Sequence, residues 1–234
     1  MPEKLVQAGK KTIVIFDEFQ EITKLNKYGF ENLLRSKIQQ QQRVNYLFLG
    51  SRTHLLSDMF NNKNRAFYNS ASHMQLGTLP HDDTIVYLQA KFGSSGIKIE
   101  MSEALYLISQ SGDIPYYIQL LASEIWQYMI TSQATVTTEI IDACTKQIVE
   151  LKQDYYYELF DRQSVMQKQL LIALVHSGDN IFSSTFTKRF RLSASSTTQK
   201  SVLVLMDSGI IDKTDNSYFI SDPFFKRFLL NYAS

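Results

Sequence analysis

A short apolar run near the start of the chain ends directly in two carboxylates. Residues Ile13–Phe16 are all apolar, and Asp17 and Glu18 follow them. An unbroken apolar run is typical of a strand buried in a parallel sheet, and α/β sheets bind ligands at the carboxyl ends of such strands. Two carboxylates at that edge can hold Mg²⁺ against phosphate groups and polarise a water molecule. A simpler alternative is that they only cap the helix that follows.

The glycine-rich loop that cradles phosphate groups beside such a strand, G-x-x-x-x-G-K-[ST], does not occur in the 234 residues. Twelve residues precede Ile13, and their single Gly-Lys pair is Gly9–Lys10. Lys4 stands five positions before that glycine and Lys11 follows that lysine, so the pair does not fit the pattern. We expect Gly9–Thr12 to form a turn that leads into the strand. The sequence thus contains one half of a nucleotide site and lacks the other.

Composition sets wide limits on function. The formal net charge of +1 gives no global attraction to nucleic acid or to membranes. The single cysteine, Cys144, excludes an internal disulfide and indicates a reducing compartment, so we expect a cytoplasmic protein. No apolar stretch reaches the length of a membrane span. The four histidines show no metal-binding spacing with Cys144 or with carboxylates, and no Ser/His/Asp or Cys/His set suggests another enzyme activity.

Residues 1–80 are predicted to form a partial α/β core. The predicted elements are strands at Ile13–Phe16, Val44–Leu49 and His73–Gly77, with helices at Tyr28–Gln42 and Thr53–Phe60. This alternation predicts parallel strands joined by crossover helices. The second strand ends in Gly50 and Ser51, so small polar residues are expected beside the carboxylates of the first strand.

Residues 81–160 are predicted to be wholly helical. Asp82 or Asp83 is expected to cap the first helix and Ser102 the second, and Thr137 is expected to start a long fourth helix that runs past Leu151. Between them, Ser111-Gly112-Asp113-Ile114 breaks the chain, and Pro115 can occupy the first turn of the third helix. One apolar stripe of that helix consists of Ile118, Leu121, Ile125 and Met129.

Residues 161–234 have the pattern of a winged helix-turn-helix. Two helices, Gln163–His176 and Ser184–Phe190, precede a third that starts with a Ser/Thr/Gln/Lys segment, Ser195–Ser201. Two alternating strands, Ile210–Lys213 and Tyr218–Ile220, then flank the turn Thr214-Asp215-Asn216. Three helices followed by a β-hairpin are typical of this module.

The order of these parts resembles the archaeal and bacterial ATPase family of the AAA+/STAND P-loop ATPases, without its Walker A region. The resemblance covers essentially the whole chain but only about the C-terminal two-thirds of a family member. Its motifs are Ile13–Glu18 as Walker B, Leu47–Ser51 as the sensor 1 strand, Arg65–Tyr68 with Met74–Leu76 and Leu79–Pro80 as the third-strand region, Ser111–Tyr117 as the Gly-x-Pro lid motif, and Ile220–Phe225 as the ending on the wing. It implies a partial P-loop NTPase core at 1–80, a helical lid at 81–160 and a winged helix domain at 161–234.

The resemblance also implies residue roles, with ATP and Mg²⁺ as cofactors. Asp17 would bind Mg²⁺ and nucleotide, Glu18 would position or activate water, and Ser51 would sense the γ-phosphate. Ile114 and Pro115 would contact the adenine side of the nucleotide. Arg52 and Arg65 are candidates for contact with phosphate or with a neighbouring subunit. Because the Walker A lysine and its Ser/Thr metal ligand are missing, nucleotide loses most of its electrostatic hold.

Three hypotheses follow from this pattern. The chain is the C-terminal portion of a P-loop ATPase that does not hydrolyse ATP alone, or a degenerate family member that acts as a binding module. In the second case, the incomplete sheet or the ATPase interface can pair two copies of the chain, since a bare strand edge must be covered.

The third hypothesis is DNA binding by the winged helix. Ser196, Thr197 and Lys200 at the start of its third helix could reach phosphates or base edges. The module from Arg162 onward carries nine basic and five acidic residues, which is a mild excess. Winged helices also dock proteins, so a protein partner remains the alternative to DNA. No membrane partner is expected.

Overall fold

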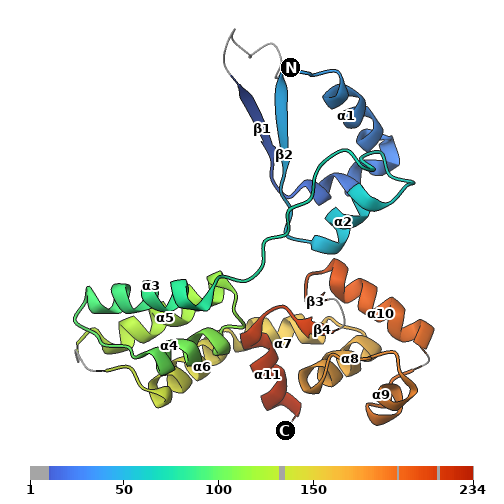
Figure 1. Ribbon diagram of the computed structural model, residues 1–234. Coiled ribbons are helices and arrows are strands. Elements are labelled where there is room, and N and C mark those ends of the chain that lie inside the picture. The colour runs from blue at the N-terminus through green and yellow to red at the C-terminus, as the bar shows by residue number, and fades with distance from the viewer. Residues whose placement is uncertain (1–10, 132–134, 194, 215–216, 234) are drawn as a thin grey trace. The chain divides into compact units, whose positions relative to one another are not determined.

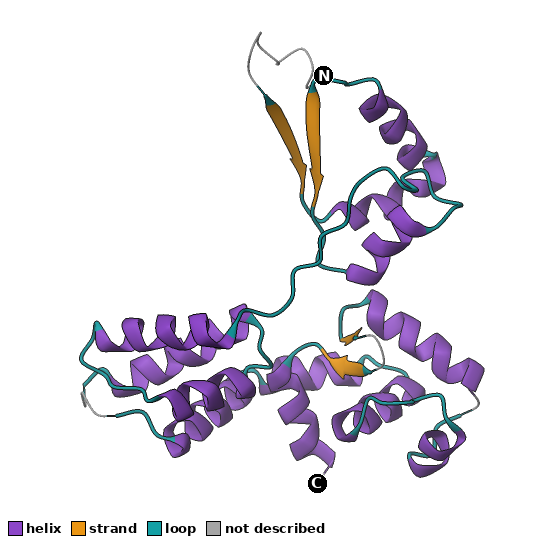
Figure 2. Ribbon diagram, viewed as in Figure 1, coloured by secondary structure: helices purple, strands orange, loops and turns teal. Residues whose placement is uncertain are grey.

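The computed structural model describes residues 11–131, 135–193, 195–214 and 217–233. The chain divides into two compact units, Met1–Leu76 and Gly77–Ser234 (Figure 1). The first unit contains a two-stranded sheet with helices, and the second is almost wholly helical (Figure 2). Across the described ranges, no helix is both long and apolar enough to cross a membrane.

Two parallel strands form the sheet of the first unit. β1 (Thr12–Phe16) pairs with β2 (Val44–Phe48), with Thr12 opposite Val44 and Phe16 opposite Phe48. The crossover between the strands contains the 3-10 helix η2 (Phe19–Tyr28) and the helix α1 (Phe30–Gln39), and α2 (Thr53–Asn61) follows β2. The expected parallel pair with a helical crossover is thus confirmed, although the sequence pattern does not reveal η2.

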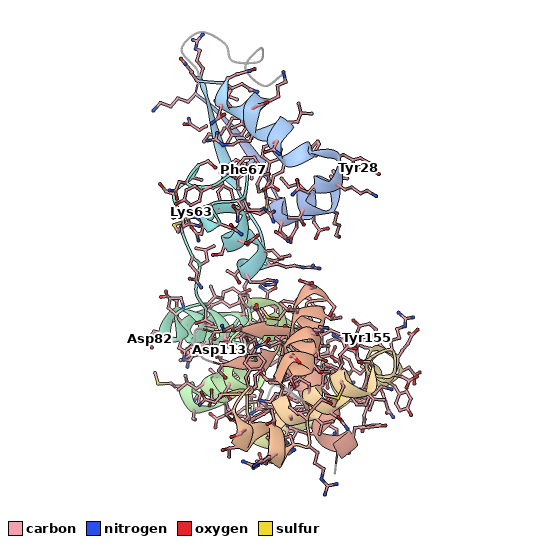
Figure 3. The ribbon with its side chains drawn as sticks, turned by 90° about the vertical axis from the view of Figure 1, so that its right-hand side faces the viewer. Tyr28, Lys63, Phe67, Asp82, Asp113 and Tyr155 are labelled. Carbon is pink, nitrogen blue, oxygen red and sulfur yellow. The ribbon has the colours of Figure 1, made fainter. Side chains whose placement is uncertain are left out.

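An aromatic cluster fills the space between the sheet and its helices. Phe19 is 1% exposed, and its ring lies 4.4 Å from that of Phe48 and 5.1 Å from that of Phe67, between ring centroids. Phe60 contacts the same rings. Figure 3 labels Phe67 within this unit. Such aromatic pairs contribute stability beyond the area that they bury, so this cluster holds the helices on one face of the sheet.

The opposite face of the sheet is exposed, which corrects the expectation of fully buried strands. Ile13 and Ile15 of β1 are 63% and 58% exposed, and Leu47 of β2 is 45% exposed. Side chains alternate between the two faces of a strand, and only the face with Phe16 and Phe48 is covered by the helices. Among the described residues nothing covers the other face.

The third strand predicted at His73–Gly77 is wrong. The structure has no strand there, and residues 71–80 are all exposed, including Met74 and Leu76. A strand needs a neighbour to accept its backbone hydrogen bonds. In the described part of the first unit the sheet consists of β1 and β2 alone, and 73–77 does not join it.

The second unit begins with five helices. They are α3 (His81–Gly93), α4 (Met101–Gln110), α5 (Pro115–Met129), α6 (Thr138–Leu151) and α7 (Gln153–Asp161). As predicted, Pro115 is the first residue of α5, the four stripe residues of α5 are buried, and Thr137 lies at the start of α6, which its side chain caps. α6 ends at Leu151 and does not run past it. The two predicted caps of α3 and α4 are wrong. Pro80 precedes α3 and Glu100 precedes α4, so Asp82, Asp83 and Ser102 lie inside the first turns.

A winged helix fold follows. Its elements are α8 (Val165–His176), α9 (Ser184–Arg189), α10 (Ser195–Asp207), β3 (Ile211–Lys213), β4 (Tyr218–Ile220) and α11 (Pro223–Ala233). β3 and β4 pair antiparallel, as predicted, while Asp215 and Asn216 of their turn lie outside the described residues. At Gly178 a Cβ atom would stand 1.7 Å from the carbonyl oxygen of Tyr218, so only glycine fits beside the wing.

One continuous hydrophobic core joins the five helices to the winged helix. It extends from Ile85 in α3 to Leu229 in α11. The domain boundaries predicted at 80/81 and 160/161 therefore stay predictions, since the chain divides into compact units only after Leu76.

We expect Phe19→Ala to destabilise the first unit by about 3–5 kcal/mol, because it removes the central ring of the aromatic cluster and leaves a cavity. Hydrogen exchange of β1 and β2, followed by mass spectrometry, measures this loss. Leu33→Ala is the matched control, because Leu33 is 56% exposed and its truncation leaves no cavity. Equal exchange in the two variants would contradict the assignment of the core.

Candidate functional site

Backbone hydrogen bonds continue past the ends of the two parallel strands. The amide of Leu49 donates to the carbonyl of Phe16, and the amide of Phe19 donates to the carbonyl of Leu49, both at 2.8 Å. The two chains therefore leave the sheet side by side. As a result the carboxylates after β1 and the small polar residues after β2 lie at the same edge.

This edge brings Glu18 and Ser51 together. The Ser51 hydroxyl donates to Oε2 of Glu18 at 2.9 Å and lies 3.2 Å from Oε1, and the Ser51 amide lies 3.4 Å from Oε2. Glu18 has a positive φ of 48°, in the left-handed region. A non-glycine residue in this region is strained, and such strain gathers at functional sites. The sequence predicted both residues for one site, and the structure places them in contact.

The carboxylate of Glu18 is stabilised in its charged form. Hydrogen bonds from Gln20 and Ser51, with the positive charge of Arg52, hold the pKa of the Glu18 carboxyl below its ordinary value. The group is therefore anionic at neutral pH. An anion of weakened basicity orients and polarises a water molecule better than it removes a proton outright.

Asp17 is exposed beside Glu18, and its Oδ1 accepts a hydrogen bond from the Glu18 amide at 2.9 Å. In the described part of the chain, no three His, Cys, Asp or Glu side chains gather as a metal site. Mg²⁺ is commonly held by one or two carboxylates, with waters and substrate phosphates completing the octahedron. An exposed single carboxylate fits that mode, and the described residues contain no site built from protein ligands alone.

The two candidate arginines differ in their surroundings. Arg65 forms ion pairs with the buried Glu31, at 3.2 Å, and with Asp58, at 2.9 Å. Through these contacts Arg65 links α1 to α2, so its role in the structure is to stabilise the packing of these two helices. Arg52 lies close enough to Glu18 for its charge to act on that carboxylate.

The Gly-x-Pro turn lies in the second unit, between α4 and α5. Gly112 and Asp113 both have positive φ, 62° and 59°, and the Asp113 carboxylate lies 3.2 Å from Nε2 of His81 (Figure 3 labels Asp113). Ile114 occupies the N-cap position of α5, and Pro115 is exposed. The turn thus presents Ile114 and Pro115 at the start of a long helix.

The same turn lies close to Pro223, the first residue of α11. A Cβ atom on Gly112 would lie 3.6 Å from Pro223, which is ordinary contact. Tyr156 of α7, which is fully buried, donates to Asp222 at 3.0 Å. Asp222 also accepts from the first amides of α11. Burial, with the negative charge of Asp222, raises the pKa values of Tyr156 and of Tyr117, which follows the turn.

The residues predicted for DNA contact lie on one surface of α10. Ser196, Thr197 and Lys200 are exposed, but Thr198 is buried and its hydroxyl donates to the carbonyl of Ser193 at 3.2 Å. Further along the helix, Leu203 and Val204 are also exposed. The exposed surface of α10 is therefore polar at its start and apolar in its middle.

Comparison with known proteins agrees with this architecture. Residues 154–231 match a family model described as a probable winged helix domain. The Walker-type ATPase of Pyrococcus abyssi is similar over 93% of this chain and 63% of its own, with 17% identity and a TM-score of 0.67. The chain therefore shares the fold of part of that Walker-type ATPase. It spans 63% of the length of that ATPase.

Two further solved structures are similar at lower scores. Thermotoga maritima RuvB matches over 96% of this chain and 72% of its own, with 13% identity and a TM-score of 0.48. ORC2 of Aeropyrum pernix matches over 95% and 66%, with 13% identity and a TM-score of 0.42. No curated protein matches the chain in sequence.

Sequence reasoning missed the contacts of three residues in this fold. Gln20 directly contacts Glu18, and its place two residues after the acidic pair is the only signal that could have indicated it. Asp222 links Tyr156 to the start of α11, and the Asp-Pro pair before an apolar segment is a helix-start signal. Tyr117 stands directly after the Pro115 motif, but nothing in its pattern marks it as partly buried beside a carboxylate.

We expect the second unit to lose stability as the pH rises above about 10, where unfolded tyrosines ionise. Because the folded pKa values of Tyr117 and Tyr156 are raised, the unfolded state releases protons first, and its ionisation favours unfolding. Tyr156→Phe should lower the unfolding free energy at pH 7 by about 1 kcal/mol and make the alkaline decline shallower.

Urea unfolding followed by the fluorescence of Trp126, the single tryptophan, measures this effect. Tyr155→Phe is the matched control for the loss of a tyrosine hydroxyl, because Tyr155 is 59% exposed. An alkaline decline that is equally steep in wild type and Tyr156→Phe would contradict the role of Tyr156.

Proposed function

We propose that this chain is the part of a P-loop ATPase that carries Walker B, sensor 1, the lid and the winged helix. The contact between Glu18 and Ser51 carries this proposal, because it brings the two predicted catalytic residues to one sheet edge. Glu18 orients the attacking water, Ser51 detects the γ-phosphate, and Asp17 holds Mg²⁺. The metal ion neutralises the charge that develops on the phosphates. Ile114 and Pro115 of the lid contact the adenine side of ATP.

Hydrolysis requires a phosphate-binding loop that the 234 residues do not contain. The exposed sheet face, with Ile13, Ile15 and Leu47, supports this view, because apolar strand faces in α/β proteins are normally covered. We propose that polypeptide carrying the loop covers this face. Pairing of two copies through the incomplete sheet is the alternative, and the chain is then a non-catalytic binding module. We also propose a cytoplasmic location, because the single cysteine, Cys144, fits a reducing compartment.

The purified chain should therefore turn over ATP with Mg²⁺ no faster than the buffer background. Asp17→Ala should change nothing, as should the control Asp154→Ala, which removes an exposed carboxylate of α7. Turnover that Asp17→Ala abolishes and Asp154→Ala preserves would overturn the proposal of an incomplete site.

The positive counterpart uses a longer chain with G-x-x-x-x-G-K-[ST] ahead of residue 1. That protein should hydrolyse ATP, and Glu18→Gln should lower its kcat by roughly 100-fold or more, since a positioned carboxylate contributes about that much. Phosphate release, followed by a coupled assay, measures both. An unchanged kcat in Glu18→Gln would remove Glu18 from the mechanism.

DNA binding by the winged helix is a second candidate function, favoured by the exposure of Ser196, Thr197 and Lys200 on α10. We expect duplex DNA to shift at low salt, and Lys200→Ala to reduce the slope of log affinity against log salt by about 1. Lys146→Ala, on α6, is the control and should leave the slope unchanged. No shift at low salt would favour a protein partner, which exposed Leu203 and Val204 could contact.

A further inference from the structure

Gln20 lies at the start of η2 and is 2% exposed. Its side-chain Nε2 donates a hydrogen bond to Oε2 of Glu18. Its Oε1 is buried and has no hydrogen-bond partner among the described residues. The orientation of the amide is fixed, because the opposite orientation would set two acceptor oxygens against each other. The buried Gln20 side chain thus donates its hydrogen bond to the Glu18 carboxylate.

Gly50 provides the space for this amide. A Cβ atom at Gly50 would stand 2.3 Å from Oε1 of Gln20, which is closer than real Cβ contacts allow. The backbone of Gly50 is not in the left-handed region, so the obstacle to a larger residue here is space and not the φ angle: an added Cβ would have to displace the Gln20 amide. Gly50 also immediately precedes Ser51, so the Gln20 side-chain amide lies between the ends of the two strands.

Packing alone does not explain a glutamine at position 20. A buried carbonyl oxygen without a partner is destabilising, and a methionine would fill similar volume without one. What only glutamine supplies is the donor to Glu18. With Oε2 engaged by Gln20 and Ser51, Oε1 has, among the hydrogen bonds of the described residues, the 3.2 Å contact to the Ser51 hydroxyl alone. That oxygen is therefore the one left to meet a water molecule.

We propose that Gln20 is a positioning residue that holds the Glu18 carboxylate against Ser51. The absence of a side chain at Gly50 leaves the space that the Gln20 amide occupies. The proposal rests on the proposed function, in which Glu18 orients the attacking water. Gln20 itself touches neither nucleotide nor water, and acts through Glu18. It keeps Oε2 turned toward Ser51 and Oε1 toward the reacting groups.

The first test is nuclear magnetic resonance of the full 234-residue chain at a fixed neutral pH. The backbone amide of Ser51 faces Oε2 of Glu18, so Glu18→Ala gives the chemical shift expected when that carboxylate is absent. Gln20→Met should move the Ser51 amide proton at least halfway toward the Glu18→Ala value. An unmoved Ser51 amide in folded Gln20→Met would overturn the proposal.

Gln41→Met is the matched control. Gln41 is the other buried glutamine of the first unit's described part, and its hydrogen bonds go to Lys37 and Tyr46. A merely structural role for buried amides predicts equal changes at Ser51 in both variants. We expect the chemical shift of the Ser51 amide proton to be unchanged in Gln41→Met.

The second test is a double-mutant cycle, which remains informative if Gln20→Met folds poorly. Gly50→Ala should raise the hydrogen exchange of β1 and β2 in the wild-type background, and should have little effect in Gln20→Ala, where the obstructing amide is gone. Gly93→Ala is the control, because no atom lies within 4 Å of a Cβ there. Equal effects of Gly50→Ala in the two backgrounds would contradict the claim that Gly50 leaves space for the Gln20 amide.

The outcomes separate the two proposals. If the Ser51 amide responds to Gln20→Met but Glu18→Gln leaves kcat of the longer chain unchanged, Gln20 positions a carboxylate that has another task, and the proposed function fails. If kcat depends on Glu18 but Gln20→Met leaves the chemical shift of the Ser51 amide unchanged, the proposed function is supported and the positioning role of Gln20 is wrong.

Discussion

The parallel pairing of β1 and β2, continued by the hydrogen bonds between Phe16, Leu49 and Phe19, determines the candidate site. In a parallel pair, both carboxyl ends lie at the same edge. A shift of one residue in register would turn each side chain of one strand to the other face, and Glu18 would no longer meet Ser51. The aromatic cluster around Phe19 stabilises this register from one side, so packing and chemistry depend on the same few contacts.

The sheet also explains which strand predictions succeeded. Ile13–Phe16 and Val44–Leu49 find each other across a helical crossover, and their apolar runs were sufficient signals. The segment His73–Gly77 has a strand-like sequence but no strand in the structure. Strand formation is a property of a pair of segments, since its hydrogen bonds and half its packing come from the neighbour. A pattern in one segment cannot state whether that neighbour is present.

Helices were easier to predict, because their hydrogen bonds are internal and their apolar spacing is local. Thr137, Pro115 and the stripe of α5 follow local rules and were correct. The contacts that shape the site are not local. Nothing in the sequence around Glu18 indicates its left-handed backbone, and the 33-residue separation of Glu18 from Ser51 has no pattern. The motif resemblance predicted that both residues belong to one site. No sequence pattern indicates that the Gln20 amide occupies the space beside Gly50, because that contact arises only from the folded chain.

Asp222 gives the second unit a comparable centre. Its carboxylate caps α11 through the first amides of that helix and accepts the hydroxyl of Tyr156 from α7. The adjacent Pro223 lies close to Gly112, in the turn before α5. A carboxylate that satisfies both a helix terminus and a buried tyrosine is costly to separate from either. The buried Tyr156 of α7 and the start of α11 therefore share one polar contact set, centred on Asp222, inside one hydrophobic core. A displacement of α7 must consequently be accommodated at the start of α11.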